Sequence, residues 1–267
     1  ASDWSSDVCS SDLLGIVICS SIAGVPENSS LGNFDKVKVN NAAYTFSTSN
    51  GKAQVIVYSP NVIRIRIDKQ NPVSDFSYAV VTGPTSCAVK VINNAAVYEI
   101  STDSLVLRIT KKPMRFTFLT KDGKVINADD PAFGTSWLGD EVTTYKSLQK
   151  GERFIGLGEQ SGSLDRAGSA LVNYNTDNPK YDNTTDRTYS TIPFYIGLHN
   201  KLAYGIFMDN PSKSLFNFGA GNNRFSYFKA ECGEMNYYFI HHTLVKDIIA
   251  SYRSEERRVG KECRSRW

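Results

Sequence analysis

The stretch VIRIRID, residues 62–68, alternates apolar and charged residues from Ile63 to Asp68. Because successive side chains of a β-strand point to opposite faces of its sheet, the three isoleucines fall on one face, and Arg64 and Arg66 fall on the other. An apolar face opposite a charged face is typical of a strand in an antiparallel sheet with one side in water. The stretch therefore predicts a half-buried antiparallel strand.

The same period of two recurs along most of the chain. SLVLRIT and RFTFLT alternate in the same way, and the later segments IPFYIGL, LAYGIFMD, RFSYFKA and MNYYFI are rich in aromatic and β-branched residues. Turn residues separate the segments, as in SNGK near Gly51 and KDGK around Gly123. Many short strands at this spacing predict an all-β fold, an antiparallel β-sandwich.

One segment has helical spacing instead. In TLVKDIIASY, residues 243–252, apolar residues recur at intervals of three to four, which places Leu244, Val245, Ile248 and Ile249 along one side of a helix. The segment predicts a single short helix at the C-terminal end of the sandwich.

The composition supplies a core and excludes several classes of protein. Hydrophobic residues make up 41% of the chain and aromatic residues 12%, which is ample for a packed core. The net charge of +3 gives no reason to expect nucleic-acid binding. Cys19, Cys87 and Cys232 lack the spacing of metal ligands, so we expect neither a metal nor a cofactor.

Both ends of the chain resemble translated DNA adapters. DWSSDVCSSDL, residues 3–13, and SEERRVGKECRSRW, residues 254–267, each resemble along their whole length the translation of a common short-read sequencing adapter. We therefore treat residues 1–13 and 253–267 as artefacts and exclude them from fold prediction. The sandwich domain is expected to occupy residues 25–252.

An apolar run precedes that domain. LGIVICSSIAG, residues 14–24, has the length of a signal-peptide core, ends in small residues, and is too short to span a bilayer. We interpret it as the remnant of a secretory signal. The expected location is secreted or periplasmic, with no membrane partner.

The alternation lapses over residues 156–186, GLGEQSGSLDRAGSALVNYNTDNPKYDNTTD. A polar loop of this length inside a compact domain is usually functional or disordered. It carries five carboxylates, namely Glu159, Asp165, Asp177, Asp182 and Asp186. Two carboxyl groups about 5 Å apart can act together as a catalytic pair, and two of these could meet in the loop. Loop carboxylates more often bind backbone N–H groups in turns, and we expect Glu159 to hold the start of the loop.

The segments FIGLGEQSGSLDRAG, YNTDNPKYDNTTDRTYSTIPFYIGL, AYGIFMDNPSKSLFNFG and GEMNYYFI follow one another in an order and spacing that resemble the N-terminal region of family 31 glycoside hydrolases, the α-glucosidase and α-xylosidase group. The likeness covers most of residues 32–252 and is strongest over residues 154–240. It implies a galactose-mutarotase-like supersandwich followed by a (β/α)8 barrel. The barrel is absent from this sequence.

The resemblance also implies which residues contact substrate. Both catalytic aspartates of such enzymes lie on the barrel, so no residue of this chain inherits a catalytic role. Asp177 in YNTD matches the aspartate that reaches into the barrel mouth and hydrogen-bonds sugar hydroxyls. Tyr174 stands where relatives often have tryptophan, at the rim of the pocket. We expect a truncated, inactive N-terminal domain of a retaining α-glycosidase, whose partners are its missing barrel and an α-glucoside or α-xyloside.

Two alternatives remain. A mutarotase-like reaction would use histidines and a carboxylate, but we interpret His199, His241 and His242 as ordinary surface residues. The aromatic residues of NYYFI and FSYFKA could instead serve a stand-alone carbohydrate-binding module. The DNA beyond residue 252 distinguishes the module from a truncated enzyme, since a natural stop codon there would favour the module.

Overall fold

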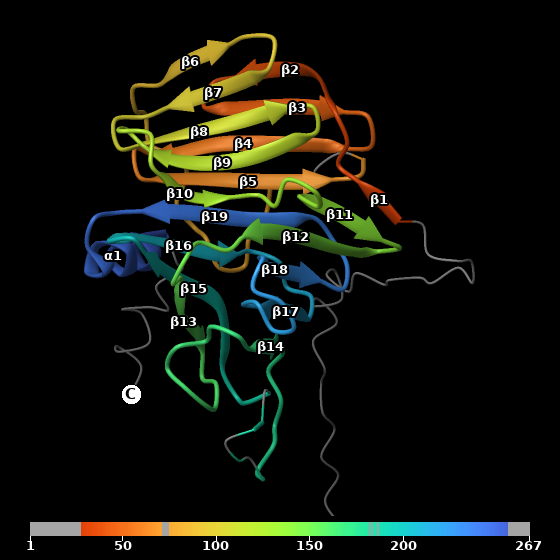
Figure 1. Cartoon of the computed structure of the whole chain (residues 1–267), viewed down its shortest axis with the longest axis vertical. Coiled ribbons are helices and arrows are strands. Elements are labelled where there is room, and N and C mark those ends of the chain that lie inside the picture. The colour runs from red at the N-terminus through yellow and green to blue at the C-terminus, as the bar shows by residue number, and fades with distance from the viewer. Residues whose placement is uncertain (1–27, 71–74, 181, 183, 186, 256–267) are drawn as a thin grey trace, which may run out of the picture.

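The computed structural model describes residues 28–70, 75–180, 182, 184–185 and 187–255. The interpretations of residues 1–13, 14–24 and 256–267 lie outside this part of the chain. The described residues form three antiparallel sheets and one helix (Figure 1).

The largest sheet has eight strands, in the order β13 (Arg153–Gly158), β15 (Thr191–His199), β16 (Leu202–Met208), β19 (Met235–His241), β5 (Val62–Asp68), β4 (Lys52–Ser59), β3 (Ala43–Thr48) and β2 (Phe34–Asn40). The second has six, β1 (Asn28–Ser30), β11 (Thr135–Leu138), β12 (Glu141–Ser147), β18 (Phe225–Ala230), β17 (Ser214–Asn217) and β14 (Ala170–Asn173). The third has five, β10 (Val125–Ala128), β9 (Met114–Thr120), β8 (Leu105–Lys111), β7 (Val97–Ser101) and β6 (Lys90–Asn93).

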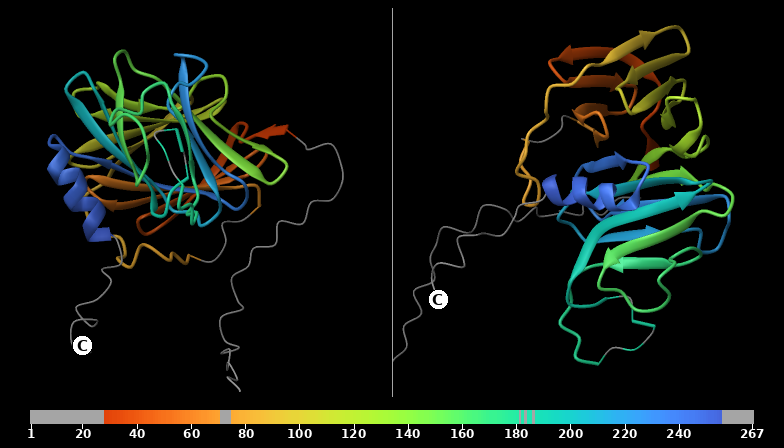
Figure 2. Two further views of the ribbon diagram at one scale, coloured as in Figure 1. Left: turned by 90° about the horizontal axis from the view of Figure 1, so that it is seen from below. Right: turned by 90° about the vertical axis from the view of Figure 1, so that its left-hand side faces the viewer.

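These sheets confirm the predicted antiparallel sandwich. One buried apolar cluster draws residues from all three sheets, among them Ile65 of β5, Phe118 of β9 and Phe228 of β18. The eight-stranded sheet thus packs against the six- and five-stranded sheets, and Figure 2 shows the strands curving around this shared core. The predicted strands are all present, because their alternating apolar side chains can be buried only on the inner faces.

The prediction for β5 is wrong in one respect, since the strand is buried on both faces. Its three isoleucines lie in the core as expected, but Arg64 and Arg66 are only 1% and 4% exposed. The outer face is covered by the segment of residues 75–80, whose Asp75 accepts from Arg64, while α1 (Val245–Glu255) covers the neighbouring strands β16 and β19 (Figure 2). The alternation correctly assigned the isoleucines and the arginines to opposite faces. The face that carries the arginines is nevertheless covered by another segment of the chain.

The predicted helix is confirmed and continues to Glu255. Ile248 and Tyr252 are buried against β16 and β19, and the Tyr252 ring stacks on Phe194 at a centroid distance of 4.0 Å. The helix begins at Val245, so Leu244 precedes it; Leu244, together with Val245 and Ile249 of the helix, stays exposed. Only part of the apolar side of the helix therefore packs against the sheet. No helix in the described residues is long and apolar enough to cross a membrane.

A buried ion pair joins the three sheets at their meeting point. Lys146 Nζ of β12 lies 2.7 Å from Oδ1 of Asp129, which follows β10, and donates to the Tyr237 hydroxyl of β19 at 3.1 Å. The other carboxylate oxygen of Asp129 accepts the Phe116 amide of β9 at 2.8 Å. Both charged side chains are 1% exposed, so each depends on the other for compensation.

The prediction of surface histidines is wrong for two of the three. His199 is buried and its Nε2 lies 2.7 Å from the Ile126 carbonyl, while the His241 Nδ1 lies 2.8 Å from the Ala203 carbonyl. His242 is half-buried, and its Nε2 lies 2.7 Å from the Ser251 hydroxyl of α1. His199 and His241 are hydrogen-bonded core residues, because buried ring nitrogens and backbone carbonyls both need partners.

Replacement of Lys146 by Met should lower the free energy of unfolding by about 3–5 kcal/mol, because it leaves the Asp129 carboxylate buried without a cation. Urea unfolding followed by circular dichroism measures this. Lys146→Met combined with Asp129→Asn should recover most of the loss. Lys213→Met, which breaks the more exposed pair with Glu231, should cost less than about 1 kcal/mol. Equal costs for the two single variants would contradict the role given to burial.

The His241 side chain should make stability depend on pH. Burial lowers the pKa of His241, a lowering that the bond to Ala203 partly offsets. The folded state therefore binds fewer protons than the unfolded state near the ordinary histidine pKa of about 6.5. The free energy of unfolding gains fully from the buried, neutral His241 ring only above the ordinary histidine pKa. This stabilisation is lost as the pH falls through the lower pKa of the folded state.

When the pH falls from about 8 to about 5, the wild-type chain should lose more stability than His241→Gln. The glutamine amide can still donate to the Ala203 carbonyl, so this variant keeps the hydrogen bond. Urea titrations of both proteins across this range measure the difference. Parallel stability profiles would show that the ring is not buried in its neutral form.

Candidate functional site

The long loop begins at an irregularity in β13. The register of β13 against β15 shifts between Gly156 and Gly158. Gly156 has φ +137°, and a Cβ there would lie 2.5 Å from the Phe194 carbonyl oxygen, so only glycine fits. The bulge bends β13 close to its end, and pairing resumes at Gly158 opposite Thr191 before the chain leaves the sandwich.

Glu159 ties the two ends of the loop together. Its amide donates to the Ser190 carbonyl at 2.8 Å, and its Oε2 accepts the Ser190 amide at 3.1 Å. The Thr188 hydroxyl also donates to the Glu159 carbonyl. The expected structural role of Glu159 is confirmed, and it extends to the end of the loop as well as the start.

Two other loop carboxylates are also occupied by local contacts. Asp165 accepts the Arg153 Nε at 2.8 Å and the Phe154 and Ala167 amides at 3.1 Å each. Partial burial would raise the pKa of Asp165, but these donors outweigh it and lower the pKa. The Thr184 hydroxyl and amide likewise lower the pKa of Asp182. Both carboxylates therefore fix turns, as expected for polar loop residues.

The predicted substrate contacts lie on the outward part of this loop. Within it the structure forms a strand that sequence reasoning missed, β14, which pairs with β17 and ends directly before Tyr174. The Tyr174 side chain is 52% exposed, and Asp177 is exposed three residues further on. The Thr176 amide donates to the Thr188 carbonyl at 3.0 Å, which holds this segment against the returning chain.

Tyr174 lines a pocket of about 380 Å³ at the base of the loop. Asn175, Thr191, Pro193 and the turn 210–214 also line it, while Asp177 is not among the lining residues. Asn173, also in the wall, is 6% exposed, and its Nδ2 has no hydrogen-bond partner within the described structure. An unpaired buried donor costs about 1–3 kcal/mol.

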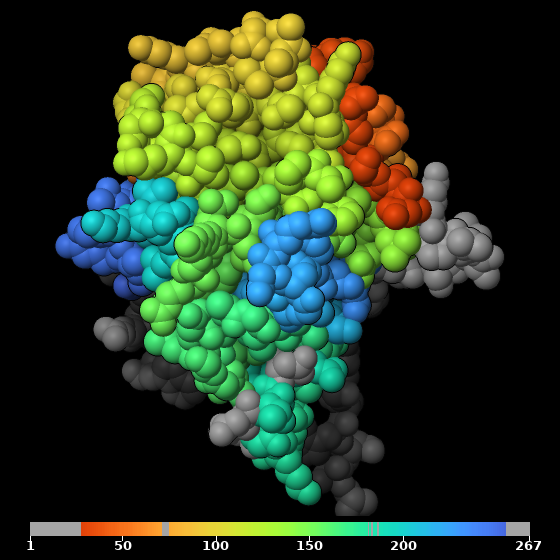
Figure 3. Space-filling view, viewed as in Figure 1, coloured from red at the N-terminus to blue at the C-terminus, as the bar shows by residue number. Residues whose placement is uncertain are grey.

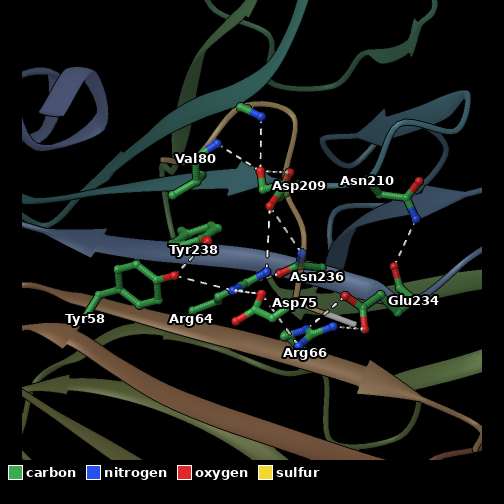
Figure 4. A network of polar contacts seen from close by, with 12 residues as sticks. Tyr58, Arg64, Arg66, Asp75, Val80, Asp209, Asn210, Glu234, Asn236 and Tyr238 are labelled. Carbon is green, nitrogen blue, oxygen red and sulfur yellow. Dashed lines mark hydrogen bonds and ion pairs between the residues drawn. The ribbon is translucent and has the colours of Figure 1, made fainter. Parts of the chain in front are cut away.

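A buried arginine network fixes one wall of this pocket (Figure 4). Arg64 donates from Nε to Asn236 at 2.9 Å and from Nη1 to Asp75 at 2.7 Å, and its Nη2 lies 3.8 Å from Asp209. Asp209 begins the turn that lines the pocket, so the outer arginine of β5 holds that turn from below. Burial raises the pKa of Asp209, which the Ser77 hydroxyl and Arg64 oppose.

The second arginine holds the same turn through another strand connection. Arg66 binds both carboxylate oxygens of Glu234, at 2.9 and 3.0 Å. The Asn210 Nδ2 then donates to the Glu234 carbonyl at 2.9 Å and to the Cys232 carbonyl at 3.0 Å, and its Oδ1 accepts the Ser212 amide at 2.7 Å. Sequence reasoning missed Asp209 and Asn210. The two arginines of β5 could have pointed to such residues, since an arginine that is buried in the fold requires an acidic partner.

The described residues contain no group of three His, Cys, Asp or Glu side chains that could hold a metal ion. The site they do form is a polar pocket beneath an exposed loop, with one tyrosine at its rim and one unpaired amide in its wall. Such an arrangement can bind and orient a hydroxyl-rich ligand, since a few placed polar groups in a hollow fix orientation.

Comparison with known proteins identifies relatives of this architecture. Alpha-glucosidase 2 of Bacillus thermoamyloliquefaciens is 25% identical over 228 residues, which are 83% of this chain and 28% of that protein. An alpha-glucosidase of Saccharolobus solfataricus is 26% identical over 61% of this chain and 23% of its own. A family 31 dextranase of Flavobacterium johnsoniae, solved with isomaltotriose, superposes with a TM-score of 0.80 at 33% identity, covering 85% of this chain and 28% of that one.

The chain thus spans about a quarter of the length of these relatives. Residues 52–217 match the family model of the glycosyl hydrolase 31 N-terminal galactose mutarotase-like domain. That match includes β5 with its two arginines, the bulge of β13, the long loop and the turn that lines the pocket. The chain belongs to the glycoside hydrolase family 31 N-terminal, galactose mutarotase-like domain family.

Proposed function

We propose that this chain is the non-catalytic N-terminal domain of a retaining α-glycosidase, and that its long loop shapes the substrate pocket of a barrel that follows it. The observation that carries the proposal is the loop itself, which projects from the sandwich with Tyr174 and Asp177 exposed (Figure 3). A loop whose ends are tied by Glu159 can present side chains to a neighbouring domain at a fixed position.

The proposed substrate is an α-glucoside or an α-xyloside. Relatives named as alpha-glucosidases and as an alpha-xylosidase, together with the dextranase solved with isomaltotriose, support this class. Asp177 is the proposed sugar contact, because an ionised carboxylate accepts strong hydrogen bonds from hydroxyl groups. Tyr174 provides a ring at the pocket rim. Hydrolysis itself is assigned to carboxylates on the barrel.

The chain is further proposed to come from a secreted or periplasmic enzyme. The apolar run of residues 14–24 supports export. The reading frame in the source DNA tests whether the protein is longer. Coding sequence for a barrel beyond residue 252 is expected, and a natural stop codon there would overturn the proposal.

The purified 267-residue chain should not hydrolyse chromogenic α-glucosides or α-xylosides, because both catalytic carboxylates are assigned to the barrel. Release of the chromophore measures activity, and the full-length enzyme serves as the positive control. Turnover that copurifies with the chain and disappears in Asp177→Ala would show that the loop is itself catalytic.

In the full-length enzyme, Asp177→Asn should lower kcat/KM for an α-glucoside by about tenfold or more, since a hydrogen bond to a charged group contributes about 1.5–3 kcal/mol. Asp182→Asn is the matched control. It removes the same charge from the same loop and keeps an oxygen that can accept the Thr184 amide. An equal effect of the two variants would mean that only loop charge matters, and would remove Asp177 as the sugar contact.

A further inference from the structure

The outer face of the six-stranded sheet carries four aromatic rings in mutual contact. Tyr145 of β12 stands directly opposite Tyr227 of β18 in the strand register, with ring centroids 5.3 Å apart. Phe133 and Phe225 approach the Tyr145 ring at 5.1 and 5.4 Å. These four residues are called the aromatic face. None is fully buried, and Phe133 is 41% exposed.

The rings are held in place from the side. The Arg224 guanidinium lies 5.3 Å from the Phe133 ring centroid and 5.2 Å from that of Phe225, with its own side chain largely in water. Tyr145 and Tyr227 are further fixed by a regular antiparallel ladder from residue 142 to residue 147. A surface ordered before binding loses little conformational entropy when a ligand arrives.

The aromatic face opens onto a line of hollows that crosses the sheet. A pocket of about 330 Å³ is lined by Phe133, Tyr145 and Glu141, and the next, of about 150 Å³, shares Glu141. That second pocket shares Lys213 and Ser214 with the pocket beneath the long loop. From β12 to β14 the line crosses three inter-strand spacings, about 14 Å. The face in Figure 3 contains the green surface of β12 and the blue surface of β17 and β18.

The charges along this line are compensated. Lys229 Nζ lies 2.5 Å from Glu141 Oε2, and Lys213 Nζ lies 2.7 Å from Glu231 Oε1. An anionic ligand would therefore meet carboxylates beside each lysine. Flat rings bordered by paired charges and hydroxyls fit a neutral ligand that has apolar ring faces and hydroxyl edges, which is the chemistry of a sugar chain.

We propose that the aromatic face and the adjoining hollows bind a chain of α-linked glucose units. The sugar rings stack on Tyr145 and Tyr227, and their hydroxyls bond to the polar groups of the Glu141–Lys229 pair. The choice of an α-glucan rests on the proposed function, whereas binding of a sugar chain rests on the aromatic face and the line of hollows that leads to Tyr174.

Affinity electrophoresis of the 267-residue chain tests the proposal. The chain should be retarded in gels that contain dextran or soluble starch, relative to bovine serum albumin. Tyr145→Ala and Tyr227→Ala should each raise the apparent Kd about tenfold, equivalent to about 1.4 kcal/mol. Tyr145→Phe keeps the ring and should be retarded like the wild type. Phe76→Ala, which removes an exposed ring elsewhere, is the matched control.

Thermal unfolding by circular dichroism identifies variants that are misfolded, and Phe133→Ala replaces any that fails. A wild-type chain that no glucan retards would overturn the proposal, as would equal retardation of the wild type and the folded alanine variants of the aromatic face. The latter result would favour a protein contact at this face.

Asp177→Asn should be retarded normally. If the chain does not bind glucan, the proposed role of Asp177 in the full-length enzyme still stands. If Asp177→Asn does not alter full-length activity, the proposed binding at the aromatic face still stands.

Discussion

The contact between Lys146 and Asp129 is the constraint on which the arrangement of the three sheets depends. It joins β12 to the residue after β10, and through Tyr237 it reaches the eight-stranded sheet. Inside an apolar core a charge must be compensated at close range, because few other groups can replace lost water. Apolar contacts have little directional preference, whereas this hydrogen-bonded pair of charges accepts only a narrow range of distances and angles. It therefore fixes how the sheets meet.

A second set of buried charges repeats this principle on the outer side of the eight-stranded sheet. Arg64 and Arg66 project away from the core, yet they are covered and engage Asp209 and Glu234. Their partners belong to connections between strands, so the arginines act together with the Asn210 side chain to position one turn. That turn forms a wall of the pocket beneath the long loop. The rigid sheet thus determines the position of a binding surface.

The domain divides its surface between a projecting loop and a flat sheet. The loop is tied at its base by Glu159 and carries Tyr174 and Asp177 outward. The sheet carries the aromatic face, whose rings come from adjacent strands in fixed register. A loop can reach into a neighbouring domain, whereas a sheet offers an extended surface along which a long ligand can lie. Both surfaces meet at the pocket that Tyr174 lines.

The sequence by itself determined the long alternating strands, the antiparallel sandwich and the single helix, because alternation and helical spacing record which side of each element is apolar. Its ordered motifs also pointed to the family. It left undetermined what covers each outer face. Arg64 and His241 were predicted to be exposed and are buried, since segments distant in sequence pack over them. Strand β14 and the pocket wall at Asn210 likewise depend on pairing with remote residues. Local periodicity carries no information about such partners, and only the tertiary structure decided them.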